Sequence, residues 1–222
     1  MKKILLLNFV IILLQYSAVA QKEKNSIEFL GGLISSNFYG GNLKGIKKEN
    51  LKSYAAGVSF GYSINRIFSL RPNLMYEIKG EETNFQPIDN YGMNLNGYTV
   101  FKFNYATMHL LSRATFGDKI NYFVEAGPYV GYLINAKSVG ISNSYANGVY
   151  YSTISREITN SCNKINIGAT LGLGAYYSLN EKLGIGLNIR RSTGLNSIAK
   201  NSNSVLSKTN SMFVLAGINY KL

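Results

Sequence analysis

Eight stretches of this chain alternate apolar and polar residues over roughly ten positions each, and the connections between them are alternately short and long. Successive side chains of a β-strand point to opposite faces, so each stretch predicts a strand with one apolar face. The last stretch is the clearest, and its apolar face comprises Met212, Val214, Ala216, Ile218, Tyr220 and Leu222. This pattern is typical of a small transmembrane β-barrel, in which lipid-facing and lumen-facing side chains take turns.

The fold that we expect is all-β: an eight-stranded, antiparallel, up-and-down transmembrane barrel. The strands are expected at about 26–39, 52–64, 67–80, 98–116, 120–136, 163–178, 183–195 and 209–222. Tight turns are expected at Asn65, Asp118 and Glu181, and long loops near 40–51, 81–97, 137–162 and 196–208. In outer-membrane barrels the tight turns face the periplasm, so the long loops are expected to face outward.

A soluble β-sandwich is the alternative, because its strands also alternate. Sandwich strands are typically about 5–6 residues long, and those expected here are roughly twice that length. The polar face of the stretch at 163–178 is also rich in glycine, as a narrow lumen requires. Both features favour the barrel.

The chain opens with Lys2 and Lys3, continues through an apolar run at 4–14 and reaches Ala18-Val19-Ala20. A positive start, a short apolar core and an A-x-A site are typical of a secretory signal peptide. The apolar run is shorter than the ~20 residues that a membrane-spanning helix needs. We therefore expect a signal peptide at 1–20 and one barrel domain at 21–222, in the outer membrane of a Gram-negative bacterium.

The formal charge is +12, from 23 Lys and Arg against 11 Asp and Glu. An exported chain without a basic helical stripe gives no indication of nucleic-acid binding. Much of the excess of positive charge lies in the expected loops, at Lys44, Lys47, Lys48, Lys200 and Lys208. The partners that we expect are outer-membrane lipid and anionic surface polysaccharide or protein, with the barrel itself a monomer.

The polar strand faces carry charged residues that a barrel would enclose: Glu28, Arg71, Glu77, Lys79, Arg113, Glu125, Arg190 and Lys221. Opposite charges in a low-dielectric lumen must pair, and eight strands leave room only for side chains. We expect Glu77 and Glu125 to neutralise Arg71, Arg113 or Arg190 in a network that plugs the lumen. A conductive or ligand-binding lumen is the alternative.

The sequence contains one cysteine, Cys162, and one histidine, His109. No intramolecular disulfide is possible, and a His-based metal cluster or His–Asp relay lacks a second histidine. Cys162 is expected to be a small residue at a loop edge, and His109 to be packed in the lumen beside Arg113. No G-x-S-x-G elbow occurs, and Gly172-Leu173-Gly174 lies inside an expected strand with no helix after it. We therefore predict no enzyme activity, no cofactor and no metal.

The segment at 105–137 contains Ala126-Gly127-Pro128-Tyr129-Val130-Gly131-Tyr132-Leu133 after a strand and a tight turn. It resembles the central hairpin of the PorT-like small outer-membrane β-barrel proteins, although His109 stands where that family commonly has proline. The segments at 70–82 and 190–198 resemble the third and seventh strands of the same family. The resemblance implies the barrel fold and the outer membrane as location, and it implies no shared chemistry.

The expected function is that of a non-enzymatic barrel whose surface loops serve adhesion, interaction or envelope integrity. Binding residues concentrate on loops that a rigid scaffold holds. The expected loop at 137–162 is the longest, and its Tyr145, Tyr150 and Tyr151 are candidate contact residues. It is either a solvated loop or a hairpin that prolongs its flanking strands. A narrow pore, or a barrel accessory to transport or secretion, is the alternative function.

Overall fold

The computed structural model describes residues 25–40, 46–85, 97–144, 150–200 and 207–222. The expected signal peptide at 1–20 lies outside these residues. Among the described residues, no helix is long and apolar enough to cross a membrane.

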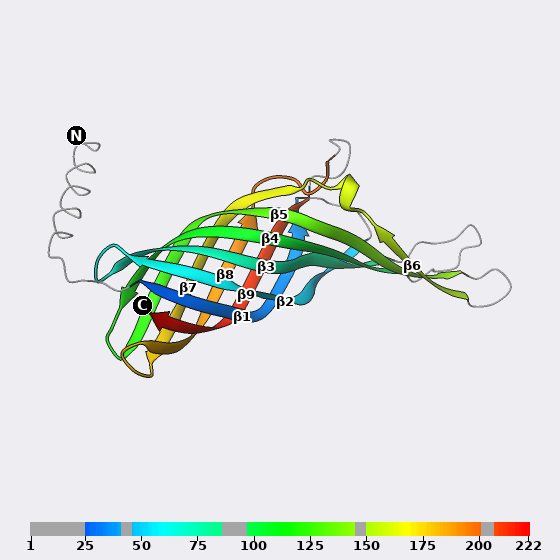
Figure 1. Cartoon of the computed structure of the whole chain (residues 1–222). Helices are drawn as coiled ribbons and strands as arrows, with labels where there is room; N and C mark the ends of the chain where they lie inside the picture. The colour runs from blue at the N-terminus through cyan, green and yellow to red at the C-terminus, as the bar shows by residue number, and fades with distance from the viewer. Residues whose placement is uncertain (1–24, 41–45, 86–96, 145–149, 201–206) are drawn as a thin grey trace, which may run out of the picture.

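The described residues form a strand-built molecule, shown in Figure 1. Its elements are β1 (Ser26–Tyr39), β2 (Ile46–Ser63), β3 (Phe68–Phe85), β4 (Gly97–Phe116), β5 (Ile120–Ser144), β6 (Tyr150–Glu157), the 3-10 helix η2 (Thr159–Ser161), β7 (Ile165–Ser178), β8 (Leu183–Gly194) and β9 (Lys208–Lys221). All strand pairings are antiparallel, and the β4–β5 and β1–β9 pairings close eight of these strands into a barrel. β6 pairs with β5 alone. The eight-stranded up-and-down barrel expected from the sequence is therefore confirmed.

The strands alternate between outward and inward side chains, as the sequence pattern predicts. In β9, Met212, Val214 and Ile218 are exposed, whereas Phe213 and Leu215 are buried in the lumen. An outer face of apolar side chains matches the hydrocarbon of a bilayer, and an inner face packs against the opposite wall.

One end of the barrel carries the short connections, at 64–67, 117–119 and 179–182, together with the ends of β1 and β9 (Figure 1). We call it the tight-turn end, and the opposite end the loop end. The Asn65 side-chain oxygen accepts hydrogen bonds from the backbone N–H groups of Ile67 and Phe68, and Asn180 does the same for Lys182 and Leu183. Gly117 has a φ of 100°, which an L side chain rarely adopts. These residues explain why the chain reverses so sharply here.

The long connections are shorter than expected, because strands occupy much of their length. Residues 46–51, 81–85, 137–144 and 150–157 are β-strand. The hairpin of β5 and β6, in register from Lys137↔Glu157 to Ser144↔Tyr150, projects beyond the barrel in Figure 1. These extensions lack the apolar alternation of a membrane strand, since no lipid contacts them. The hydrophobic pattern therefore stops before the strands do.

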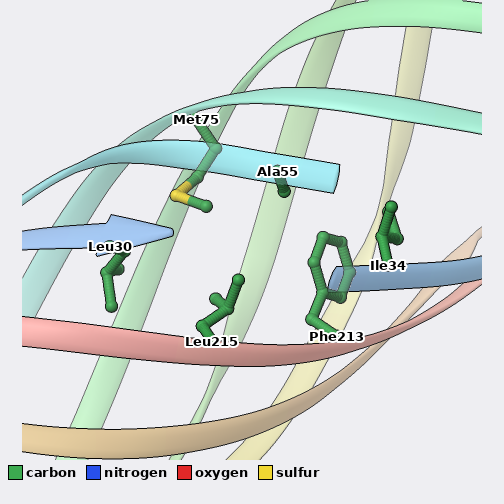
Figure 2. Packing of buried hydrophobic residues seen from close by; sticks show 6 residues of the cluster. All are labelled: Leu30, Ile34, Ala55, Met75, Phe213 and Leu215. Atoms are coloured by element: carbon green, nitrogen blue, oxygen red, sulfur yellow. The ribbon is translucent and has the colours of Figure 1, made fainter. Parts of the chain in front are cut away.

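The lumen also holds large apolar side chains, which the expectation of a small, polar inner face missed. Figure 2 shows one cluster between β1, β2, β3 and β9, formed by Leu30, Ile34, Ala55, Met75, Phe213 and Leu215. A second cluster at the loop end includes Phe103, Tyr105, Leu133 and Cys162. Cys162 is buried there, and its thiol donates to the Ile158 carbonyl at 3.2 Å.

Candidate functional site

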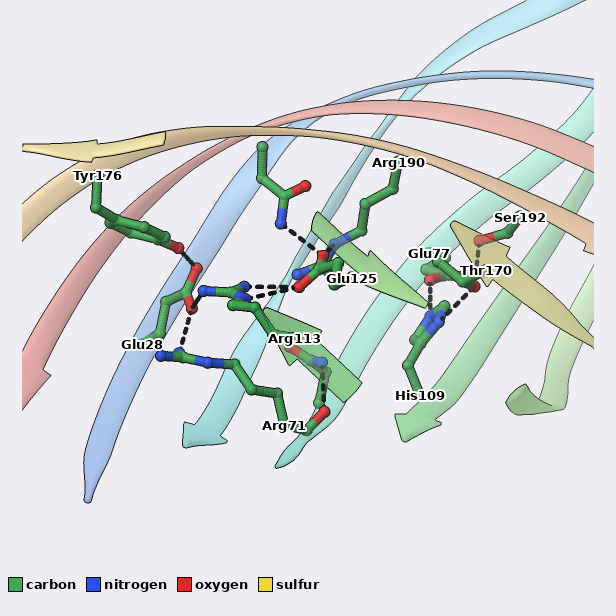
Figure 3. Close-up of polar contacts among 12 residues, drawn as sticks. Glu28, Arg71, Glu77, His109, Arg113, Glu125, Thr170, Tyr176, Arg190 and Ser192 are labelled. Atoms are coloured by element: carbon green, nitrogen blue, oxygen red, sulfur yellow. Dashed lines mark hydrogen bonds and ion pairs between the residues drawn. The ribbon is translucent and has the colours of Figure 1, made fainter. Parts of the chain in front are cut away.

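Charged side chains of the lumen gather in two groups, and Figure 3 shows both except for Lys79 of the second group. The first, which we call the arginine network, comprises Glu28, Arg71, Arg113, Glu125 and Arg190. The second, which we call the histidine cluster, comprises Glu77, Lys79, His109, Thr170 and Ser192. Inward strand positions bring the members of each group together from strands distant in sequence.

In the arginine network, Glu125 is held between two guanidinium groups. Its Oε2 lies 2.9 Å from Arg113 Nε and 2.8 Å from Arg113 Nη2, and its Oε1 lies 2.6 Å from Arg190 Nε. Asn188 donates a further hydrogen bond to Oε1 at 2.8 Å. Both carboxylate oxygens of Glu125 are thus satisfied, as burial of a charge requires.

Glu28 is the second carboxylate of this network. Its Oε2 lies 2.9 Å from Arg71 Nη1 and 3.5 Å from Arg113 Nη1, and its Oε1 accepts a hydrogen bond from the Tyr176 hydroxyl. Arg113 therefore bridges the two carboxylates. Three guanidinium groups face two carboxylates, so the arginine network has one positive charge in excess.

In the histidine cluster, both carboxylate oxygens of Glu77 have partners. Its Oε2 lies 2.8 Å from Lys79 Nζ, and its Oε1 lies 2.8 Å from His109 Nε2. Thr107 donates to Oε2 at 3.0 Å. The Lys79 ammonium also lies 4.6 Å from the centre of the Tyr129 ring, within the range of a cation–π contact.

The pairing within the lumen differs in part from the expected one. Glu125 contacts Arg113 and Arg190 as expected, but Glu77 pairs with Lys79 and His109 and contacts no arginine among the described residues. His109 accordingly lies beside Glu77 rather than Arg113. Glu77 and Arg71 face the lumen at different heights of β3, six residues apart, so the carboxylate and the guanidinium do not meet.

Lys221, which we expected inside the lumen, is exposed at the tight-turn end. It is the last residue of β9, so β9 does not continue beyond it to enclose its side chain. The side chains of the candidate contact residues Tyr145, Tyr150 and Tyr151 lie outside the described structure. Tyr145 lies outside the described residues, and Tyr150 and Tyr151 are described only as part of β6.

The histidine cluster also contains a hydroxyl–imidazole–carboxylate sequence of contacts. Thr170 Oγ1 lies 3.0 Å from His109 Nδ1, and His109 Nε2 lies 2.8 Å from Glu77 Oε1. A base beside a hydroxyl is the arrangement that activates a nucleophile. Here the three side chains are at most 3% exposed, and Thr170 is further bonded to the Ser192 hydroxyl at 2.7 Å. None of them lines the cavities of about 840, 550 and 400 Å³ in the described structure.

Sequence reasoning missed the neutral partners of the charged groups, among them Thr170, Tyr176, Asn188 and Ser192. All four occupy inward positions of β7 and β8, so the same alternation that selected Arg190 contained the signal. The carboxylate that each of them contacts depends on the strand register, which the alternation does not give. In that register Arg190, for example, lies opposite Gly172 on β7 and Phe213 on β9.

The family model of the outer membrane protein beta-barrel domain matches residues 19–200. A search of curated protein sequences finds no match.

Several solved structures resemble the chain at low sequence identity. The outer membrane protein OprG from Pseudomonas aeruginosa is 13% identical, with 91% of this chain and 98% of that chain covered and a TM-score of 0.45. Neisserial surface protein A is 14% identical, with 89% and 97% covered and a TM-score of 0.43. Ail, the attachment invasion locus protein of Yersinia pestis, is 12% identical, with 89% and 99% covered and a TM-score of 0.36. Since the family model spans most of its length, the chain belongs to the outer membrane protein beta-barrel family, and its location is the outer membrane of a Gram-negative bacterium.

Proposed function

We propose that this protein is a non-enzymatic outer-membrane barrel that presents a surface sheet for adhesion to anionic surface polysaccharide. The observation that carries the proposal is the length of the strands at the loop end. β5 has 25 residues, whereas a membrane-spanning strand needs about 9–11. The surplus of β5, together with β6 and the matching ends of β2, β3 and β4, forms a sheet beyond the lipid-facing surface.

The charge of this end supports an anionic partner. On β5, the outward residues Val130, Tyr132 and Ile134 are apolar. The exposed residue that follows them toward the loop end, Lys137, is charged. Exposed cations at the loop end of the described structure are Lys47, Lys52, Lys102, Lys137, Arg156, Lys164 and Lys200. Glu157 is the exposed carboxylate among the described residues of this end, and Glu49 and Glu82 are half-buried. A surface with this excess of cations attracts polyanions by an interaction that salt screens.

Binding to immobilised heparin, used as a polyanion probe, tests the proposal. Purified protein in lipid vesicles is compared with the double variant Lys137→Gln/Arg156→Gln and with the control Lys119→Gln/Lys182→Gln, which removes two cations from the tight-turn end. We expect the first variant to bind several-fold more weakly and the control to bind as the parent does. Equal binding by both variants, or binding that added salt does not weaken, would refute the polysaccharide partner.

A plugged lumen is part of the proposal, and the narrow pore is its competitor. The arginine network, the histidine cluster and the two apolar clusters occupy the lumen between the two ends, which supports a closed interior. Planar-bilayer recordings of the purified monomer separate the two functions. We expect no discrete conductance steps, and steps that recur with every insertion would favour the pore.

Within its family, we infer that the chain lies among the PorT-like proteins. The support is the sequence resemblance at 105–137, which covers parts of β4 and β5 and the tight turn between them. Sequence profiles built separately for PorT-like and other barrels of the family test this inference. A higher score for the PorT-like profile is expected, and a lower one would place the chain in another branch.

A further inference from the structure

A cavity of about 400 Å³ opens at the tight-turn end of the barrel, and two members of the arginine network, Arg71 and Arg113, line it. Ser26, Ser69 and Lys221 are among its other lining residues. The cavity is therefore lined by donors of hydrogen bonds, far from the surface sheet at the loop end.

Arg71 is incompletely paired within this cavity. Its side chain is 12% exposed, and its Nη1 reaches Glu28 Oε2 at 2.9 Å. Arg113 approaches the same oxygen at 3.5 Å, so the two arginines share it. The Nε of Arg71 is buried without a hydrogen-bond partner in the described part of the chain. A buried N–H of a charged group that lacks an acceptor is costly, so the guanidinium of Arg71 is not fully satisfied by its protein partners. An incoming acceptor would reach Arg71 at the 12% of its side chain that is exposed.

The neighbouring backbone leaves room for the Arg71 guanidinium. A Cβ at Gly61 on β2 would lie 3.1 Å from Arg71 Cζ and would overlap the Ser26 hydroxyl. Gly61 thus lets the guanidinium lie close against the barrel wall, where it faces the cavity. A side chain at this position would displace the Ser26 hydroxyl and would require a small shift of the guanidinium.

The local charge balance favours an anion. The arginine network has one guanidinium in excess of its carboxylates, and the cavity lining adds the ammonium-bearing Lys221 and the carboxylate-bearing Glu181, which leave that excess unchanged. Guanidinium groups bind oxyanions through short, charge-assisted hydrogen bonds. The hydroxyl groups of Ser26 and Ser69, which also line the cavity, are additional donors. Together these donors outnumber the two oxygens of a carboxylate, so an oxyanion with more oxygens fits them better.

We propose that this cavity binds a phosphate group, with Arg71 as its charged anchor and the Ser26 and Ser69 hydroxyls as further donors. The phosphate is either free inorganic phosphate or the headgroup of an anionic phospholipid in the adjacent leaflet. Both have the same oxyanion chemistry, and the experiment below distinguishes them.

The test follows the side-chain Nε–H resonances of arginine by NMR, with ¹⁵N-arginine-labelled barrel in uncharged detergent micelles. The Arg71→Lys variant identifies the Arg71 signal by its loss, and exposed Arg191 on β8 serves as the internal control. Inorganic phosphate is added at constant ionic strength, in parallel with acetate and chloride. We expect a saturable shift of the Arg71 signal with phosphate, a weaker effect of acetate, and no saturable shift of Arg191. A shift that does not saturate, that Arg191 shares, or that acetate produces at lower concentration would overturn the proposal.

Calorimetric titration gives an independent readout. We expect Arg71→Gln to weaken phosphate binding about tenfold or more, and Arg191→Gln to leave it unchanged, because a charge-assisted hydrogen bond is lost only in the first. Heat-modifiability gels establish that each variant is folded. If Arg71→Gln does not fold, Arg71→Lys replaces it, and an unaltered affinity in the folded variant refutes the anchor role. Dihexanoyl phosphatidylglycerol is the lipid probe: tighter binding than inorganic phosphate assigns a headgroup, and weaker binding assigns the free ion.

Discussion

Lys79 Nζ lies 2.8 Å from Glu77 Oε2, and both side chains are buried in the lumen on the same face of β3. Residues two apart along a strand share a face, so the local sequence alone brings this ammonium and carboxylate together. The Tyr129 ring contacts Lys79, and His109 contacts Glu77. The stability of the pair therefore depends on both charges being present.

A double-mutant cycle on this pair tests its buried character. Lys79→Met or Glu77→Gln alone leaves one buried charge without its partner and should destabilise the barrel by about 3–5 kcal/mol. The combined variant removes both charges and should recover most of that loss, because a buried ion pair and neutral residues of similar size are often nearly equivalent. Urea unfolding in lipid vesicles measures the cycle. Additive losses in the double variant would mean that the two groups are solvated independently.

Glu125 should be the most sensitive carboxylate of the arginine network. Its replacement by Gln removes the charge that faces both Arg113 and Arg190, and we expect a loss of about 3–5 kcal/mol. Glu157→Gln on β6 is the matched control, since that carboxylate is exposed and should change stability by less than about 0.5 kcal/mol. The urea midpoints of the two variants provide the comparison. An unchanged midpoint for Glu125→Gln would indicate a wet lumen and would favour the pore.

Alanine substitutions at two adjacent glycines of β1 test which face of this strand points into the lumen. A Cβ at Gly32 would overlap the backbone carbonyl oxygen of Val214, whereas a Cβ at Gly31 would meet no described atom within 4 Å. Gly32→Ala should therefore cost about 1–3 kcal/mol through overpacking. Gly31→Ala, on the lipid face, should be close to neutral. Equal effects in unfolding experiments would contradict the assigned register of β1 against β9.

The sequence was sufficient to predict the barrel, because membrane strands must alternate and every alternating stretch became a strand. The same rule selected Glu28, Arg113, Glu125 and Arg190 as inward residues. It predicted the arginine partners of Glu125 but not the partners of Glu77. The contact of Glu77 with His109 depends on the register of two strands, whereas its contact with Lys79, two residues along the same strand, could have been predicted from the sequence. The sequence left open whether 137–162 is a loop or a hairpin, and the structure shows the hairpin of β5 and β6. It missed the extensions of β2 and β3, because strands outside the bilayer need no apolar face.

The orientation of the barrel decides where the surface sheet and the cavity of the tight-turn end act. An epitope tag between Ala146 and Asn147 lies in the connection from β5 to β6, and one at Asp118 lies in a tight turn. Insertions are tolerated best at connections, so the first tag should leave assembly unchanged in heat-modifiability gels. We expect antibody to label the first tag on intact cells and the second only after the outer membrane is permeabilised. Labelling of Asp118 alone on intact cells would place the β5–β6 hairpin in the periplasm, and the proposed adhesion surface would then be unable to meet a polysaccharide outside the cell.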